Sequence, residues 1–232
     1  MSYVPRPLFN PIAELYERYA DVNDAVYRPF LERSLPRTGK RAVDLGCGSG
    51  RFTGLLADRC AQVLAVDLAE REIEIARAKR PRPNVEYRAG CIMDLSPAED
   101  GPFDVVLSVN TLFHLFRQHG IDRVLGHTRS LVAPGGTAVI VDVVSPGPRS
   151  LLHHRWWGVQ EAARTLARRR SLSGAWTVLR LRQHPVWMQH ARMNQPLTRD
   201  EFHRRYLAAF PGALFTDDID SFVCALTWHR PL

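Results

Sequence analysis

The sequence contains little cysteine and little lysine, and each scarcity narrows the possible functions. The only four cysteines are Cys47, Cys60, Cys91 and Cys224. They form no CxxC pair and no Cys/His zinc spacing, so we expect free thiols, no structural metal and no disulfide framework. Lys40 and Lys79 are the only lysines, so arginine carries nearly all the positive charge behind the net charge of +7. Arginine is a permanent charge with fork-shaped donors, so clusters of it would suit carboxylates or phosphates.

Long apolar runs and internal repeats are also missing. No stretch approaches the length needed to cross a bilayer, and residues 1–20 have prolines and charges where a signal peptide would need an apolar segment. We therefore expect a cytoplasmic protein. No repeat indicates a solenoid. The 232 residues, 45% of them hydrophobic and 24% charged, suffice for one substantial domain plus a subdomain.

The stretch that organises the chain is RAVDLGCGSGRFT, residues 41–53. Its apolar start predicts a buried strand at residues 41–45, and its glycines predict a turn where a ligand can approach the backbone. The dinucleotide fingerprint GxGxxG would need glycine in place of Arg51, which disfavours NAD and FAD. The second strand, residues 62–66, leads to Asp67, an acid placed to accept hydrogen bonds from both hydroxyls of a ribose.

Strands and helices alternate along much of the chain. Further strands are predicted at residues 85–89, 103–109 and 137–144, and helices at residues 8–32, 50–60, 69–79, 121–131 and 199–209. A closing hairpin is expected to end in SFVCALTW. This alternation predicts an α/β fold with a parallel sheet, whose ligands bind outside the carboxyl ends of the strands.

VDLGCGSGRFT followed by VLAVDLAE resembles the first two motifs of the class I S-adenosylmethionine-dependent methyltransferases. FDVVLSVNTLFHL and LVAPGGTAVIVD extend the resemblance, which covers about residues 40–145. It implies a Rossmann-like, seven-stranded, mostly parallel sheet flanked by helices, with the last strand antiparallel, and S-adenosylmethionine as the cofactor. The cofactor-binding residues that it implies are Asp44, Gly46, Cys47, Gly48 and Gly50 in the glycine turn, Asp67 and Leu68 at the ribose, Cys91 and Ile92 at the adenine, and Asn110 after the fourth strand.

Two details of this resemblance leave alternatives. Many family members have Asp where this chain has Cys91, and a thiol is a poorer acceptor for the adenine amino group. The adenine contact is therefore expected to rest on the backbone of Ile92. The family often lays its N-terminal segment across the cofactor, so Tyr16 and Tyr19 could shield the methionine end. Aromatic residues on a helix are also typical of a hydrophobic core.

The sequence divides into four parts. These are an N-terminal helical cover at 1–39, a cofactor-binding core at 40–145, a basic helical lid between strand 5 and the last helix at 146–197, and the last helix and hairpin at 198–232. The segment from Pro146 to Pro196 contains one acid, Glu161, but nine arginines and four histidines. Leu152, Trp156, Val159, Ala163 and Leu166 have helical spacing, which predicts a buried face.

The basic lid has three interpretations. It could bury Trp156, Trp157, Trp176 and Trp187 over the acceptor while its arginines face water. It could dock an anionic substrate or a carrier protein. It could instead lie on a membrane surface or on nucleic acid, although SVNTLFH lacks the Pro-Pro-aromatic signature of enzymes that methylate base amines. The links SPGP and NQP indicate a mobile lid.

Histidine supplies the candidate bases. Methyl transfer from a sulfonium needs alignment rather than a protein nucleophile, but the acceptor must lose a proton. His114 follows the fourth strand and is the first candidate, with His153 and His154 after it; a histidine pair in a basic helix can also be purely structural. Asp142 is the only acid near the end of the fifth strand, so no catalytic metal is expected.

The sequence therefore predicts methyl transfer to the oxygen, nitrogen or carbon of a small, largely apolar or aromatic acceptor, plausibly in specialised metabolism. One alternative is a cyclase that holds the same cofactor without methylating. Another is a methyltransferase of RNA or of a carrier-bound or membrane-associated substrate.

Overall fold

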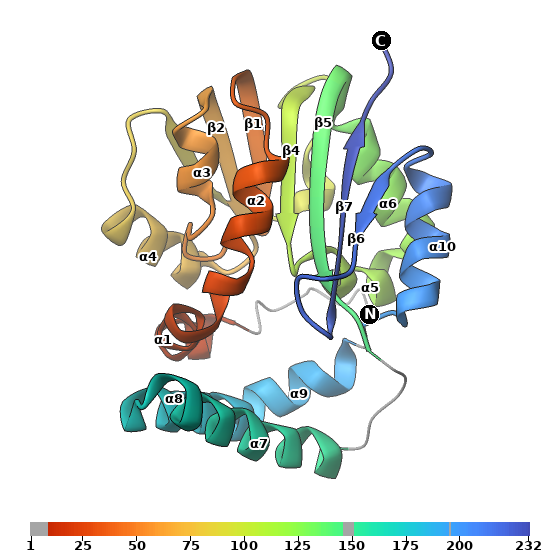
Figure 1. The fold of residues 1–232 in the computed structure, drawn as a ribbon. Coiled ribbons are helices and arrows are strands. Elements are labelled where there is room, and N and C mark those ends of the chain that lie inside the picture. The colour runs from red at the N-terminus through yellow and green to blue at the C-terminus, as the bar shows by residue number, and fades with distance from the viewer. Residues whose placement is uncertain (1–8, 146–150, 195) are drawn as a thin grey trace, which may run out of the picture.

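The computed structural model, which describes residues 9–145, 151–194 and 196–232, has a seven-stranded sheet at its centre (Figure 1). The strands are β1 (Gly39–Leu45), β2 (Cys60–Asp67), β3 (Val85–Ala89), β4 (Phe103–Val109), β5 (Val132–Val143), β6 (Leu214–Thr216) and β7 (Val223–His229). Their order is β3-β2-β1-β4-β5-β7-β6, and β7 runs antiparallel to both of its neighbours. The other neighbouring pairs are parallel. The predicted α/β sheet with an antiparallel last strand is confirmed.

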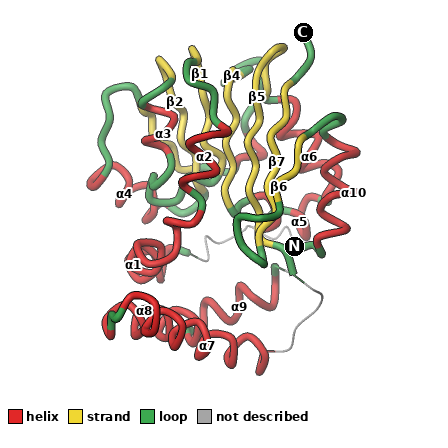
Figure 2. The backbone as a smooth tube through the Cα atoms, viewed as in Figure 1, coloured by secondary structure: helices red, strands yellow, loops and turns green. Residues whose placement is uncertain are grey.

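Helices cover both faces of this sheet (Figure 2). They are α1 (Ala13–Asn23), α2 (Arg28–Ser34), α3 (Thr53–Ala57), α4 (Glu70–Lys79), α5 (Phe116–His119), α6 (Ile121–Ser130), α7 (Leu151–Arg169), α8 (Leu172–Gln183), α9 (Pro185–Met193) and α10 (Arg199–Ala209). Short 3-10 turns lie at Asn10–Ile12, Asp24–Val26, Ile92–Asp94 and Leu112–His114. Ala42 packs in the layer formed with α2 and α3, while its neighbour Val43 packs in the layer formed with α6 and α10. Strand side chains alternate between two covered faces, which explains the nearly continuous apolar run of β4.

The helix predicted at residues 50–60 is shorter than expected. Only Thr53–Ala57 is α-helical. Gly50 has a φ of 79°, which a right-handed helix does not accommodate, and Cys60 already begins β2. The glycine turn therefore extends further than the apolar spacing indicated.

Helices α7, α8 and α9, called the lid from here on, form a layer beyond the carboxyl ends of the parallel strands (Figure 1). The hairpin of α7 and α8 packs on α1 through a small apolar cluster whose buried members are Ile12, Leu15, Tyr19, Ala162, Val178 and Leu181. The predicted hinges SPGP and NQP fall partly on residues 146–150 and 195, outside the described residues, so mobility of the lid stays a prediction. Within the described ranges, no helix is both long and apolar enough to cross a membrane.

The lid does not bury its tryptophans as expected. Trp156 and Trp176 are each 60% exposed, so the interpretation in which the lid buries all four tryptophans over the acceptor is wrong. The cause is the way α7 packs. A side chain on Gly158 would meet the Cβ of Arg182 at 2.5 Å, so the two helices approach closely at this glycine. Its buried neighbours on α7, Ala162 and Thr165, are also small.

Candidate functional site

A cavity of about 560 Å³ lies at the carboxyl ends of β1, β2 and β4, next to α1 and the end of α9. Its walls come from segments far apart in the sequence, including Phe9 before α1 and Asn194 after α9. The predicted site residues that line it are Tyr16, Gly46, Gly48, Asp67, Leu68, Cys91, Ile92, Asn110 and His114. The parallel strands bring most of these residues to one edge because their carboxyl ends meet there.

The glycine turn and Asp67 form one hydrogen-bonded unit. Gly48 donates its backbone N–H to Asp67 Oδ2 at 2.9 Å, and Ala69 donates to Oδ1 at 2.8 Å. Burial raises the pKa of Asp67, and these two hydrogen bonds oppose that rise. Gly46 has a φ of 72°, and an added Cβ would lie 2.2 Å from the side chain of Thr111. The turn therefore brings bare backbone against the cavity and fixes the Asp67 carboxyl beside it.

Three predicted cofactor residues of this turn lie outside the cavity lining. Asp44 accepts a hydrogen bond from the Thr53 hydroxyl at 2.6 Å, and burial raises its pKa to about 7. Cys47 is buried, and Gly50 lies against the Tyr87 ring. These residues support the turn from behind.

Glu72 lines the cavity but is not among the site residues predicted from the sequence. It is 2% exposed, and neither carboxyl oxygen has a hydrogen-bond partner in the part of the chain that the structure describes. Burial, followed by the charge of Asp67, raises its pKa to about 8. Its position was a usable signal, because Glu72 lies on the buried face of α4 with Ile73 and Ala76. A buried acid is rare unless a partner satisfies it, so an acid on an apolar helix face marks a position to explain.

Apolar and aromatic side chains form another part of the cavity wall, including Phe9, Tyr16 and Met193. Of these three, only Tyr16 is predicted from the sequence to lie in the site. His114 lies there, with its ring centroid 4.0 Å from that of Phe113 and 4.6 Å from that of His190. Burial lowers the pKa of His114 to about 4, although a hydrogen bond with the Asn110 backbone opposes the shift. His114 is therefore uncharged at neutral pH, and it is a weaker base than we expected.

The remaining candidates lie elsewhere. The Tyr19 hydroxyl donates to Glu161 Oε1 at 2.8 Å and accepts from Arg182 Nη2 at 2.7 Å, so Tyr19 joins α1 to the lid instead of lining the cavity. His153 and His154 begin α7 and are not among the lining residues. Tyr206 donates to Asp142 Oδ2 at 2.6 Å, and Asp142 does not line the cavity either.

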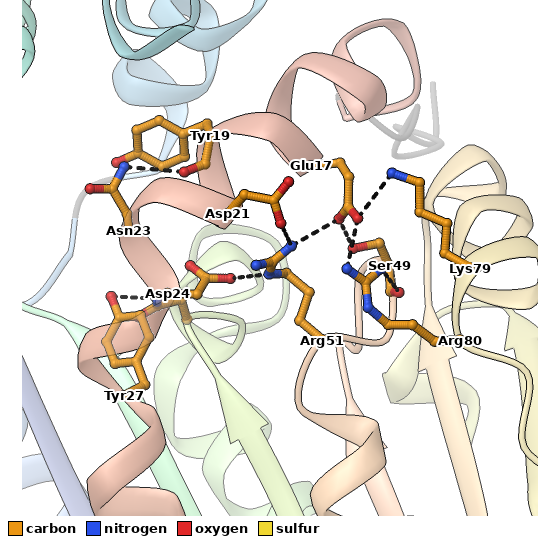
Figure 3. Close-up of polar contacts among 11 residues, drawn as sticks. Glu17, Tyr19, Asp21, Asn23, Asp24, Tyr27, Ser49, Arg51, Lys79 and Arg80 are labelled. Carbon is orange, nitrogen blue, oxygen red and sulfur yellow. Dashed lines mark hydrogen bonds and ion pairs between the residues drawn. The ribbon is translucent and has the colours of Figure 1, made fainter. Parts of the chain in front are cut away.

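Helix α1 is fixed to the glycine turn by a buried carboxylate (Figure 3). Glu17 accepts a hydrogen bond from the Ser49 hydroxyl, and its Oε1 accepts from Arg80 Nη2 at 2.7 Å. Burial alone would raise the pKa of Glu17, but these hydrogen bonds and the charges of Arg80 and Arg51 hold it at about 2. Arg51 also pairs with Asp21 at 2.7 Å. The wall that carries Tyr16 is therefore tied to the turn by charge.

The expected free thiols are confirmed for all four cysteines. His203, Asp217 and Cys224 place one ligand atom each within 4.8 Å of one another, between α10 and the β6–β7 hairpin. Arg199 already pairs with Asp217 Oδ1 at 2.8 Å, which balances this carboxylate within the protein. The trio lies away from the cavity and takes no part in it.

Comparison with known proteins agrees with this geometry. Residues 42–136 match the family model described as a methyltransferase domain. A ubiquinone biosynthesis O-methyltransferase of Methylocella silvestris is 36% identical over 140 residues, which cover 54% of this chain and 53% of the relative. The chain thus spans about half the length of such curated relatives.

Two solved structures share the fold. One is a chain of the complex between the Haloferax volcanii Trm112 methyltransferase activator and the putative methyltransferase, with a TM-score of 0.66 and 16% identity over 99% of this chain and 100% of that one. The other is the N-methyltransferase NodS of Bradyrhizobium japonicum in complex with S-adenosylhomocysteine, with a TM-score of 0.59 and 16% identity over 96% and 100% of the two chains. Residues 42–136 therefore match a methyltransferase domain, and the two solved structures show that the chain shares its fold with methyltransferases.

Proposed function

We propose that the chain transfers a methyl group from S-adenosylmethionine to a hydroxyl group of a small, largely apolar and aromatic acceptor. The observation that carries the proposal is the composition of the cavity wall. Asp67 and Glu72 contribute carboxyl groups beside the glycine turn, while Phe9, Tyr16 and Met193 contribute apolar surface. One cavity thus offers acceptors for a polar, positively charged ligand and a dry wall for an apolar one.

The charges of the wall fit this cofactor better than a dinucleotide. Among the lining residues that the structure describes, Arg117 is the only lysine or arginine, and two carboxyl groups lie near the turn. A pyrophosphate would meet these acids unfavourably, whereas a sulfonium and an ammonium group would be attracted. We assign Asp67 to the ribose hydroxyls, the bare backbone at Gly46 and Gly48 to the methionine part, and the Ile92 backbone with Cys91 to the adenine.

The residues near His114 would orient the acceptor. S-adenosylmethionine supplies the methyl group from its sulfonium sulfur. The rest of the cofactor leaves as a neutral thioether, S-adenosylhomocysteine. His114 is uncharged at neutral pH, so a ring nitrogen can accept a hydrogen bond from the acceptor hydroxyl and fix its direction. A pKa of about 4 makes His114 a poor sink for the proton, which favours an acceptor whose hydroxyl is itself acidic, such as a phenol. The aromatic wall would exclude water during transfer.

Oxygen is favoured over nitrogen and carbon because the curated relative described above is an O-methyltransferase. The test is incubation of the purified chain with S-adenosylmethionine and matched panels of phenols, aromatic amines and carbon acids. We expect S-adenosylhomocysteine and an O-methylated product from the phenols. Rearrangement of an acceptor without S-adenosylhomocysteine would instead establish the cyclase alternative, and methylation of the amine panel alone would overturn the choice of oxygen.

A further inference from the structure

Helix α7 has an apolar stripe on its outer face that the described part of the chain leaves largely exposed. We define the stripe as Leu152, Trp156, Val159, Ala163 and Leu166. Leu152 is 78% exposed and Trp156 is 60% exposed. On the neighbouring helix α8, Leu172 and Trp176 are also mostly exposed. Spacings of four and three residues place the whole stripe along one side of a 19-residue helix.

Folding does not explain this stripe. The sequence pattern predicts that these residues form the buried face of α7, yet the helix turns its small residues inward instead. Gly158, Ala162 and Thr165 are the buried positions, and Ala162 belongs to the cluster shared with α1. Five apolar positions in helical register, each of them exposed to water in part, lower solubility and contribute little packing. A stripe of this kind is typical of a surface that has a partner.

The charges of the helices that carry the stripe and its neighbours indicate what the partner must be. The exposed arginines of α7, α8 and their connection are Arg155, Arg164, Arg168, Arg169, Arg170 and Arg180. The only acid between residues 151 and 194 is Glu161, which is occupied by Arg182 at 2.6 Å. The segment between residues 151 and 194 is therefore strongly cationic, and its one acid is already paired. A partner must bring negative charge and an apolar surface together.

We infer that the outer face of α7 docks on an anionic phospholipid bilayer, with the apolar stripe inserted at the boundary between headgroups and acyl chains. Leu and Trp side chains suit that depth, while arginines reach the lipid phosphates with their long stems. The inference goes beyond the proposed methyl transfer and does not depend on it.

Two other partners fit the face less well. A second copy of the chain, docked stripe to stripe, would bring its arginines against those of the first copy with no exposed acid on either helix to separate them. Nucleic acid would satisfy the arginines, but its phosphate backbone offers no apolar surface for Leu152 or Val159. A lipid bilayer supplies both requirements.

The experiment is vesicle co-sedimentation of the full chain. The vesicles are made either of phosphatidylcholine alone or of equal parts phosphatidylcholine and phosphatidylglycerol. We expect binding to the anionic vesicles, weak binding to the neutral ones, and weakening of the anionic binding as salt is added. The variant Trp156→Glu/Val159→Glu should bind anionic vesicles roughly tenfold to hundredfold more weakly, because it loses two inserted side chains.

The matched control is Leu214→Glu. Leu214 is 70% exposed on β6, an edge strand of the sheet and not part of the lid, so the same kind of substitution should leave vesicle binding unchanged. Trp156 and Val159 are exposed, and a thermal midpoint equal to that of the wild-type protein shows that the double variant folds. Equal binding by the double variant and the control would overturn the inference. So would binding to RNA but not to anionic vesicles, or a concentration-dependent dimer that the double variant abolishes.

Discussion

The substitution Glu72→Gln should stabilise the ligand-free protein at alkaline pH. Both oxygens of Glu72 are buried without a hydrogen-bond partner among the described residues, and burial together with Asp67 raises its pKa to about 8. An unfolded chain would return this carboxyl to its ordinary value near 4.5. Glutamine keeps the shape of the side chain and removes the charge. The substitution therefore isolates the cost of ionising one buried acid.

The sign of the effect follows from the raised pKa. The folded protein binds this proton more tightly than the unfolded chain does, so protonation stabilises the fold fully below about pH 4.5. That stabilisation is lost as the pH rises toward the folded pKa of about 8. A shift of this size corresponds to a ceiling of roughly 5 kcal/mol, and structural relaxation should leave about 2 to 4 kcal/mol.

Urea unfolding of the ligand-free protein between about pH 5 and about pH 9 measures the effect. We expect the wild-type protein and Glu72→Gln to differ little in free energy of unfolding at the acidic end. At the alkaline end the variant should be the more stable by about 2 to 4 kcal/mol. Glu70→Gln is the matched control, because Glu70 is exposed on the same helix α4 and should leave the pH profile of the wild-type protein unchanged.

Parallel pH profiles for the wild-type protein and Glu72→Gln would refute the reasoning. They would mean that Glu72 ionises normally and therefore that water or a local movement solvates it. A variant that was less stable at every pH would point to lost packing instead of a removed charge.

Three further substitutions test the site. Glu17→Gln should lower the free energy of unfolding by about 3 to 5 kcal/mol, because it leaves Arg80 without its buried partner. The pKa of Glu17 is depressed to about 2, so the wild-type advantage should be present above about pH 4.5 and fade as the pH falls toward 2 in acid unfolding. Asp67→Asn should weaken S-adenosylmethionine binding in calorimetry by about 1 to 3 kcal/mol, and unchanged affinity in a folded variant would contradict the ribose assignment. Gly46→Ala should destabilise the fold far more than Gly212→Ala in urea unfolding: both glycines have positive φ, but only at Gly46 does the added Cβ meet a side chain, at 2.2 Å.

Much of the fold could be predicted because its signals are local. The apolar run of β4 and the periodicity of α4 depend on residues close in sequence, and β1 to β5 overlap the five strand ranges that the sequence predicts. The glycine turn could also be predicted, because a turn with positive φ favours glycine. Asp67 could be predicted because the end of an apolar strand is visible in the neighbouring residues. Alternation of strands and helices then leaves few arrangements for the sheet.

The cavity wall could be predicted only in part. Asp67 ends β2 and His114 lies in the short turn that comes after β4, so their places follow from the sheet. Phe9, Glu72 and Met193 reach the cavity from three separate segments, and no spacing within any one of them shows that they meet. Their shared wall exists because α1 and α9 close over the same strand ends.

The sequence by itself determined which elements form and where the backbone must turn, because those choices depend on neighbouring residues. Only the tertiary structure decided which side of an amphipathic helix is buried. The spacing of the apolar stripe on α7 predicts that the stripe is buried. Instead α7 buries the side that carries its small residues, where Gly158 lies close to Arg182 of α8. Tyr19 likewise turns to Glu161, a residue 142 positions away, instead of the cavity. Such outcomes are set by the shapes of surfaces that meet only after folding, and periodicity within one helix does not contain them.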